Sequence, residues 1–206
     1  MKVILINGSP RKEGCTFTAL SEIKNTLIEE GIDAEIFQIG MDIVGCRACR
    51  ACSKIGKCVI DDKVNEFVDL ARNADGFIFG SPVHYAAAGG NITSFMDRAF
   101  FSGKSAFLFK PAACVLSARR GGTTAAFDQL NKYFTLSQMP VISSRYWNMV
   151  HGSNPEDVVK DEEGMQTMRV LARNMAWFLR LREAGDKLGV ELPKQEETIK
   201  STNFIR

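Results

Sequence analysis

The sequence lacks the features that mark a membrane, secreted or nucleic-acid-binding protein. Its longest apolar runs, such as FLF and AACVL, are far shorter than the roughly 20 residues that cross a bilayer. The opening MKVILING is too short for a signal-peptide core. The net charge is only +2, and like charges do not gather into long blocks. We therefore expect a cytoplasmic protein, with reduced thiols and with no membrane or nucleic-acid partner.

Strand and helix patterns alternate along the chain. Short apolar runs rich in β-branched residues predict buried strands, and apolar residues at helical spacing predict helices between them. The strands are expected at 2–7, 34–39, 76–81, 112–118 and 139–144, and the helices at about 16–30, 63–72, 91–100, 123–134 and 163–184. This alternation predicts an α/β fold, a doubly wound five-stranded parallel sheet of the flavodoxin-like order 2-1-3-4-5.

The 206 residues are enough for one domain with a buried core. We expect this domain over 1–185, with a cysteine-rich insertion at 41–62 and a polar tail or arm at 186–206. In such a fold, ligands bind beyond the carboxyl ends of the strands, near the switch point between the first and third strands. The loops after residues 7, 81 and 117 are therefore the first places to look for a site.

The loop after the first strand reads GSPRKEGCTFT. It has neither the G-x-G-x-x-G of a dinucleotide site nor the glycine and lysine of a P-loop. It offers hydroxyls instead, because Ser9, Thr16 and Thr18 flank a predicted helix start. Free N–H groups at that start attract a phosphate, and Arg11 adds a planar donor fork. An ordinary helix cap is the alternative interpretation.

Two further loops keep side chains small at predicted strand ends. SPVHYAAAGG follows the third strand, where Pro82 stiffens the exit and His84 and Tyr85 face the expected ligand. SARRGGTT follows the fourth strand, where Gly121 and Gly122 permit close backbone approach. Each loop alone could be a half-buried or solvated turn, but the three together indicate one binding site.

These motifs resemble the family of NAD(P)H-dependent FMN reductases and multimeric flavodoxins, over about residues 1–140. The resemblance implies that FMN binds at these loops, with its phosphate on the first. The cofactor-binding residues that it implies are Ser9, Arg11, Thr16, Phe17, Thr18, Pro82, Val83, His84, Tyr85, Ser117, Ala118, Arg119, Gly121 and Gly122. Relatives usually carry Asn where this chain has Cys15, so we interpret Cys15 as a small residue packed at a helix start. No catalytic side chain is expected.

Four of the six cysteines lie in the loop after the second strand. Cys46, Cys49, Cys52 and Cys58 read C-x2-C-x2-C-x5-C. Zinc sites usually pair two separated C-x2-C units, whereas a constant step of three is typical of runs that hold a [4Fe–4S] cluster. The Arg and Lys residues between them would offset the charge of the thiolates and also suit reactive thiols. The spacing favours a cluster and leaves redox-active thiols, disulfides or zinc as alternatives. Cys114 is expected to be inert core.

The cysteine spacing resembles the iron–sulfur flavoprotein branch of the same family. That resemblance implies an oxidoreductase in which FMN takes a hydride from NADH or NADPH, or electrons from ferredoxin, and reduces an acceptor such as a quinone or a free flavin. It also implies a homodimer or homotetramer, with the cluster near the FMN of a neighbouring subunit. Residues 143–162 and the tail from Asp186 are candidates for subunit contacts. A non-enzymatic electron carrier or thiol-based redox sensor is the alternative, although such carriers are typically acidic.

Overall fold

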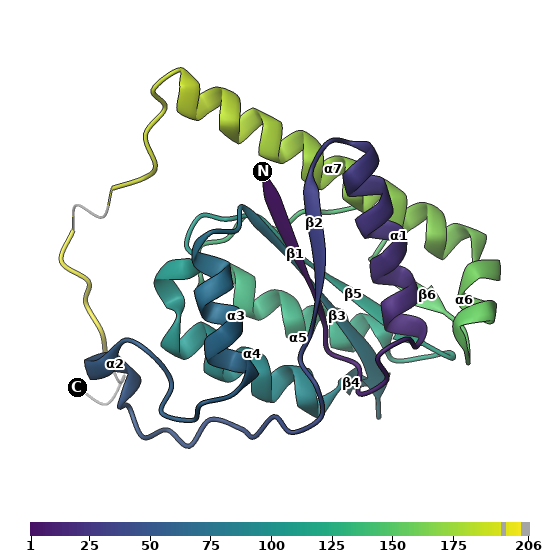
Figure 1. Ribbon diagram of the computed structural model, residues 1–206, viewed down its shortest axis with the longest axis horizontal. Coiled ribbons are helices and arrows are strands. Elements are labelled where there is room, and N and C mark those ends of the chain that lie inside the picture. The colour runs from purple at the N-terminus through teal and green to yellow at the C-terminus, as the bar shows by residue number, and fades with distance from the viewer. Residues whose placement is uncertain (195–196, 203–206) are drawn as a thin grey trace.

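A parallel sheet forms the centre of the computed structural model, which describes residues 1–194 and 197–202 (Figure 1). The strands are β1 (Lys2–Asn7), β2 (Asp33–Gln38), β3 (Gly76–His84), β5 (Ala112–Ala118) and β6 (Met149–His151), in the spatial order β2-β1-β3-β5-β6. A short strand, β4 (Ala87–Ala88), pairs antiparallel with the end of β3. Apart from β4, the five parallel strands follow the predicted order 2-1-3-4-5, so the predicted fold class is confirmed.

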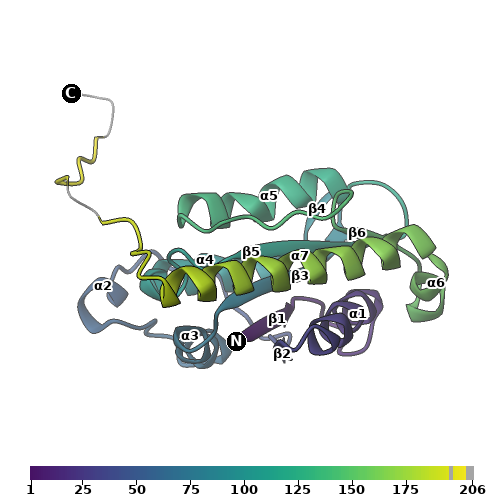
Figure 2. The same cartoon turned by 90° about the horizontal axis from the view of Figure 1, so that it is seen from above.

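Helices cover both faces of the sheet. They are α1 (Cys15–Glu29), α2 (Cys52–Ile55), α3 (Lys63–Arg72), α4 (Gly90–Ser102), η1 (Lys104–Ala106), α5 (Thr123–Leu136), α6 (Pro155–Lys160) and α7 (Glu162–Lys187). Helices α3, α4 and α5 pack on one face in a cluster rich in phenylalanine, and α1 and α7 pack on the other. Figure 2 shows α1 and α3 on opposite sides of the strands.

Alternate residues of each central strand enter opposite cores. In β1, Ile4 and Ile6 join the cluster under α3 and α4, whereas Val3 and Leu5 join the cluster under α1 and α7. This is the period of two that a strand buried on both faces requires. Because both faces are covered by helices, ligands can reach the sheet only at its ends.

The position predicted for the fifth strand is wrong. In the segment 139–144, only Val141 forms an isolated bridge, to Ala112. The chain then leaves the sheet because α7 binds it: Asn174 Nδ2 donates to the Ser143 carbonyl over 2.8 Å, and the Ser144 hydroxyl donates to the Thr167 carbonyl over 2.7 Å. Pairing with β5 resumes in β6, which delivers residues 152 and 153 to the carboxyl edge of the sheet.

None of the helices in the described part of the chain combines the length and the apolar content that a bilayer-crossing segment needs. Helix α7 continues to Lys187, two residues past the predicted domain limit, and the chain beyond it runs away from the sheet (Figure 1). The division of the chain into a domain and an arm stays a prediction.

Candidate functional site

A hollow of about 380 Å³ lies at the carboxyl ends of β1, β3, β5 and β6, and we call it the strand-end hollow. Its lining residues are Ser9, Pro10, Arg11, Cys15, Thr16, Pro82, Val83, His84, Ser117, Ala118, Arg119, Gly152 and Ser153. All three loops singled out in the sequence contribute to this lining. The fold therefore brings together residues that lie more than 100 positions apart, and it does so at the strand ends where ligands of such sheets bind.

The start of α1 forms one wall of the strand-end hollow. None of the described side chains caps this start, and its first turn carries no acidic residue. The first-turn N–H groups therefore keep their partial positive charge for an anion. Ser9 and Thr16 are buried beside them, and the Thr16 hydroxyl lies 2.8 Å from the Ser117 hydroxyl across the hollow. This wall suits a phosphate monoester.

A buried asparagine and its half-buried glutamine partner, neither of which was predicted, hold the first loop in shape. Asn7, at the end of β1, donates to Gln38 Oε1 over 2.6 Å and to the Lys12 carbonyl over 3.2 Å, and its Oδ1 accepts from the Ser9 N–H over 3.1 Å. Gln38, its register partner in β2, donates to the Ser9 carbonyl over 2.8 Å. The sequence signal was a lone Asn closing an apolar strand.

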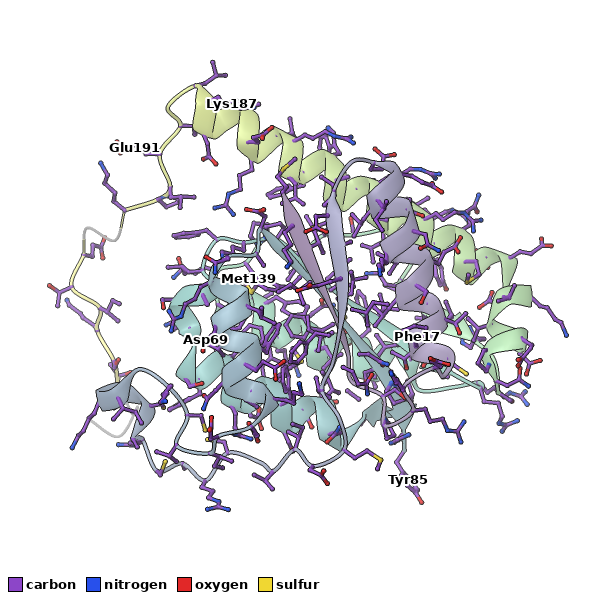
Figure 3. All side chains as sticks on the ribbon, viewed as in Figure 1. Phe17, Asp69, Tyr85, Met139, Lys187 and Glu191 are labelled. Atoms are coloured by element: carbon purple, nitrogen blue, oxygen red, sulfur yellow. The ribbon has the colours of Figure 1, made fainter. Side chains whose placement is uncertain are left out.

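The second loop is a tight hairpin. Val83 pairs with Ala88 and His84 with Ala87, so Tyr85 and Ala86 are its two central residues. Both have positive φ, +49° and +59°, as the mirror-image turns of two-residue hairpins require. Val83 and His84 line the strand-end hollow, while the Tyr85 side chain is fully exposed and points away from the body of the protein (Figure 3).

Gly122 packs against Ala86 of this hairpin and does not line the strand-end hollow. Its φ of +97° is a left-handed conformation, and an added Cβ would lie 2.6 Å from Ala86 Cα. Glycine is therefore required for two reasons, the backbone angle and the contact. Phe17, Thr18, Tyr85 and Gly121 also lie outside the lining, and the Thr18 hydroxyl donates to the Gly14 carbonyl over 3.3 Å.

Four lining residues were not expected from the sequence: Pro10, Cys15, Gly152 and Ser153. Gly152 and Ser153 are not predicted from the sequence, because the strand-like pattern at 139–144 lies upstream of the strand that delivers them, β6. The Cys15 thiol donates to the Gly152 carbonyl over 3.7 Å, which joins the first loop to the last. Burial raises the pKa of Cys15, against a smaller lowering by its backbone hydrogen bond and by Arg11. The Cys15 thiol is therefore a weaker nucleophile than an unperturbed cysteine.

A second hollow, which we call the cysteine hollow, lies between the loop 46–60 and the end of α4. Its lining residues are Cys46, Arg47, Cys49, Arg50, Cys52, Cys58, Val59, Ile60, Arg98, Phe101 and Ser102. All four predicted metal ligands therefore face one space, and all are free thiols. Cys114, by contrast, is fully buried in β5, and burial strongly raises the pKa of its thiol.

The donor set of the cysteine hollow fits a [4Fe–4S] cluster in type and number, because four thiols and none of the described carboxylates line it. Within the described residues, no group of three or more His, Cys, Asp or Glu side chains stands ready to hold a metal ion. The hollow encloses about 20 Å³, room for about one water molecule, so a cluster requires the loop to move outward. Cys46 and Cys49 are exposed with most of this loop, which can therefore move without opening the core.

Comparison with known proteins agrees with this geometry. The model of the family described as NADPH-dependent FMN reductase matches residues 1–154. An iron–sulfur flavoprotein of Methanocaldococcus jannaschii is 32% identical over 191 residues, covering 88% of this chain and 98% of that protein. An iron–sulfur flavoprotein of Methanosarcina thermophila is 27% identical, covering 88% and 96%. The solved structure of a flavodoxin from the domain Archaea superposes with a TM-score of 0.61 at 15% identity, covering 87% of this chain and 99% of that one.

Proposed function

The chain belongs to the family of NADPH-dependent FMN reductases, and from this premise we propose that it is an oxidoreductase that binds FMN in the strand-end hollow. The observation that carries the proposal is the convergence of three loops on one hollow, with an uncapped helix start at one side and small backbone loops at the other. FMN has a planar ring joined by a short chain to a phosphate monoester. The phosphate matches the helix start, and the ring matches the small backbone loops.

The phosphate would lie at the start of α1. Ser9 and Thr16 would donate their hydroxyls to it, and the helix N–H groups would add charge-assisted bonds. Arg11 is exposed at the mouth of the hollow, where its guanidinium balances the phosphate charge. The Asn7–Gln38 pair would hold Ser9 in place, so that the first loop is formed before the ligand arrives.

The flavin ring would lie between the hairpin of β3 and β4 and the loop after β5. Pro82, Val83 and His84 would border one side, and Ser117, Ala118 and Arg119 the other. The redox chemistry would be supplied by the bound FMN, and the chain would position the ring and keep water from it. Backbone N–H groups beside the ring would stabilise negative charge that develops on it during reduction.

We further propose that Cys46, Cys49, Cys52 and Cys58 bind a [4Fe–4S] cluster, which would supply one-electron transfer. The four thiols that line the cysteine hollow support this assignment. Helix α4 starts directly after the flavin-side hairpin and ends at the cysteine hollow, and its 13 residues span about 20 Å. Because this length of helix separates the two hollows within one chain, it supports a homo-oligomer in which the cluster of one copy passes electrons to the flavin of another copy.

NADH, NADPH or ferredoxin would supply electrons, and a quinone, a free flavin or another small acceptor would take them. Steady oxidation of NADH or NADPH with a quinone or ferricyanide would establish an enzyme. Bound flavin that dithionite reduces but neither nucleotide does would favour the electron carrier or redox sensor instead.

The phosphate assignment is tested by titrating the flavin-free chain with FMN and with riboflavin, which lacks the phosphate. Replacing both Ser9 and Thr16 by alanine should weaken FMN binding at least about tenfold, the ratio for a loss of 1.4 kcal/mol, because two bonds to a charged group are lost. Thr18→Ala is the matched control, since the Thr18 hydroxyl bonds the Gly14 carbonyl outside the lining. A double variant that keeps the wild-type preference for FMN over riboflavin would reject the assignment.

A further inference from the structure

Arg98 is buried at 1% exposure on α4, and its guanidinium faces the cysteine hollow. Its Nε and Nη2 donate to the Cys58 sulfur over 3.3 and 3.4 Å. The same group makes a two-pronged ion pair with Asp62, with Nη1 2.5 Å from Oδ2 and Nη2 2.9 Å from Oδ1. The planar guanidinium of Arg98 thus bridges the Asp62 carboxylate and the Cys58 thiol.

The guanidinium also contacts the backbone of the cysteine loop. Nη1 donates to the Val44 carbonyl over 3.4 Å, and Nη2 lies 3.0 Å from the Ile60 carbonyl. Because Nη2 carries two hydrogens and has three acceptors, one of its hydrogens is shared between two of them. These two carbonyls lie on either side of the cysteine run. Arg98 therefore closes the loop at its base, while the loop itself stays exposed.

Cys58 is also held through its own backbone. Its N–H donates to Asn65 Oδ1 over 3.1 Å, and its carbonyl accepts from Asn65 Nδ2 over 3.0 Å. Asn65 lies in α3, whose first turn is capped by Asp62. Cys58 is thus fixed by two helices, whereas Cys46 and Cys49 lie on exposed chain. In the described residues, no side chain donates to the sulfurs of the other three hollow cysteines.

We propose that Arg98 is the positioning residue of the cysteine hollow: it holds Cys58 as the anchored ligand and, through two N–H···S bonds, raises the reduction potential of a cluster bound there. This inference rests on the proposed cluster. Hydrogen bonds to cluster sulfurs and nearby charge set such potentials, and outer partners of ligands commonly change metal affinity about 10–100-fold. Asp62 would moderate the effect, because its carboxylate offsets the guanidinium charge.

Two substitutions should shift the cluster potential in opposite directions. Arg98→Lys keeps the charge and loses the fork, so the midpoint potential should become more negative and a chelator should remove iron about tenfold faster or more. Asp62→Asn keeps a good helix cap and removes the opposing charge, so the potential should become more positive. General loosening of the loop would not produce opposite shifts.

The experiment is a redox titration of anaerobically prepared full chain, followed by EPR, together with iron analysis and FMN titration. Arg72→Lys, an exposed arginine of α3, is the matched control and should behave as wild type. FMN affinity should be unchanged in all three variants, which shows that they fold.

Wild-type potential and a wild-type rate of iron loss in Arg98→Lys, or potential shifts of the same sign in Arg98→Lys and Asp62→Asn, would overturn the inference while the cluster stands. A wild-type chain that takes up no iron would overturn the cluster and the inference together, and the FMN titration would still test the flavin site on its own. If Arg98→Lys does not fold, Asp62→Asn alone decides the sign.

Discussion

Asn7→Leu should damage both the stability of the fold and FMN binding, because Asn7 is fully buried and holds the first loop. Leucine is close in size, so the change leaves little cavity and mainly removes hydrogen bonds. The Ser9 N–H, the Lys12 carbonyl and Gln38 Oε1 each lose their bond to Asn7. The buried Ser9 N–H left unpaired costs about 1–3 kcal/mol. The lost bonds to the half-buried Gln38 and the exposed Lys12, whose groups regain water, add about 1 kcal/mol, so about 2–4 kcal/mol is expected in total.

A loss of 2–4 kcal/mol should lower Tm by about 5–15 °C in a chain of this length. FMN affinity should fall by about tenfold or more, because Ser9 is no longer fixed toward the phosphate. The assays are a thermal melt by circular dichroism and an FMN titration followed by fluorescence quenching. Asn148→Leu is the matched control: Asn148 is also buried and donates to the Cys114 carbonyl over 3.1 Å, but it lies outside the first loop. Wild-type FMN binding by Asn7→Leu, or an equal loss of FMN affinity in both variants, would show that Asn7 does not hold Ser9 for the phosphate.

Two more predictions concern the rim and the thiol of the strand-end hollow. Gly122→Ala should cost about 1–2 kcal/mol in backbone strain, plus the displacement of Ala86, and should lower both Tm and FMN affinity. Gly121→Ala, where an added Cβ meets nothing, should change neither, and equal effects of the two would contradict the role given to Gly122. In the iron-free and flavin-free chain, Cys15 should react with iodoacetamide at neutral pH more slowly than the exposed Cys46, because Cys15 is half-buried and burial raises its pKa; equal labelling rates in peptide mass spectra would count against a shielded thiol at this wall.

Much of the fold and of the strand-end hollow could be predicted from local patterns. The order of the strands follows from alternating strands and helices, since crossover connections leave few topologies. Ser9, Thr16, His84 and Ser117 could be found because they lie at or soon after the carboxyl ends of predicted strands or at the helix start that follows, and parallel strands end at one edge of the sheet. These residues needed no knowledge of distant contacts.

Residues whose role depends on distant partners could not be found in this way. Arg98 reads in the sequence as an ordinary arginine of a helix, and its bond to Cys58 spans 40 positions. The Asn7–Gln38 pair depends on the register of β1 with β2. The last strand was misplaced because 139–144 has strand-like composition, while hydrogen bonds to α7 take that segment out of the sheet. The loop at 152–153 therefore could not be assigned to the strand-end hollow from the sequence, because its position depends on these contacts with α7.

An absorption spectrum of the chain purified without oxygen, combined with analysis of FMN, iron and acid-labile sulfide, shows whether both groups are bound. We expect about one FMN per chain together with about four iron and four sulfide, and broad iron–sulfur absorption beneath the flavin bands. Flavin without iron would contradict the cluster in the cysteine hollow and leave the flavin site standing. A chain that binds no FMN, even when FMN is added, would contradict the flavin site in the strand-end hollow.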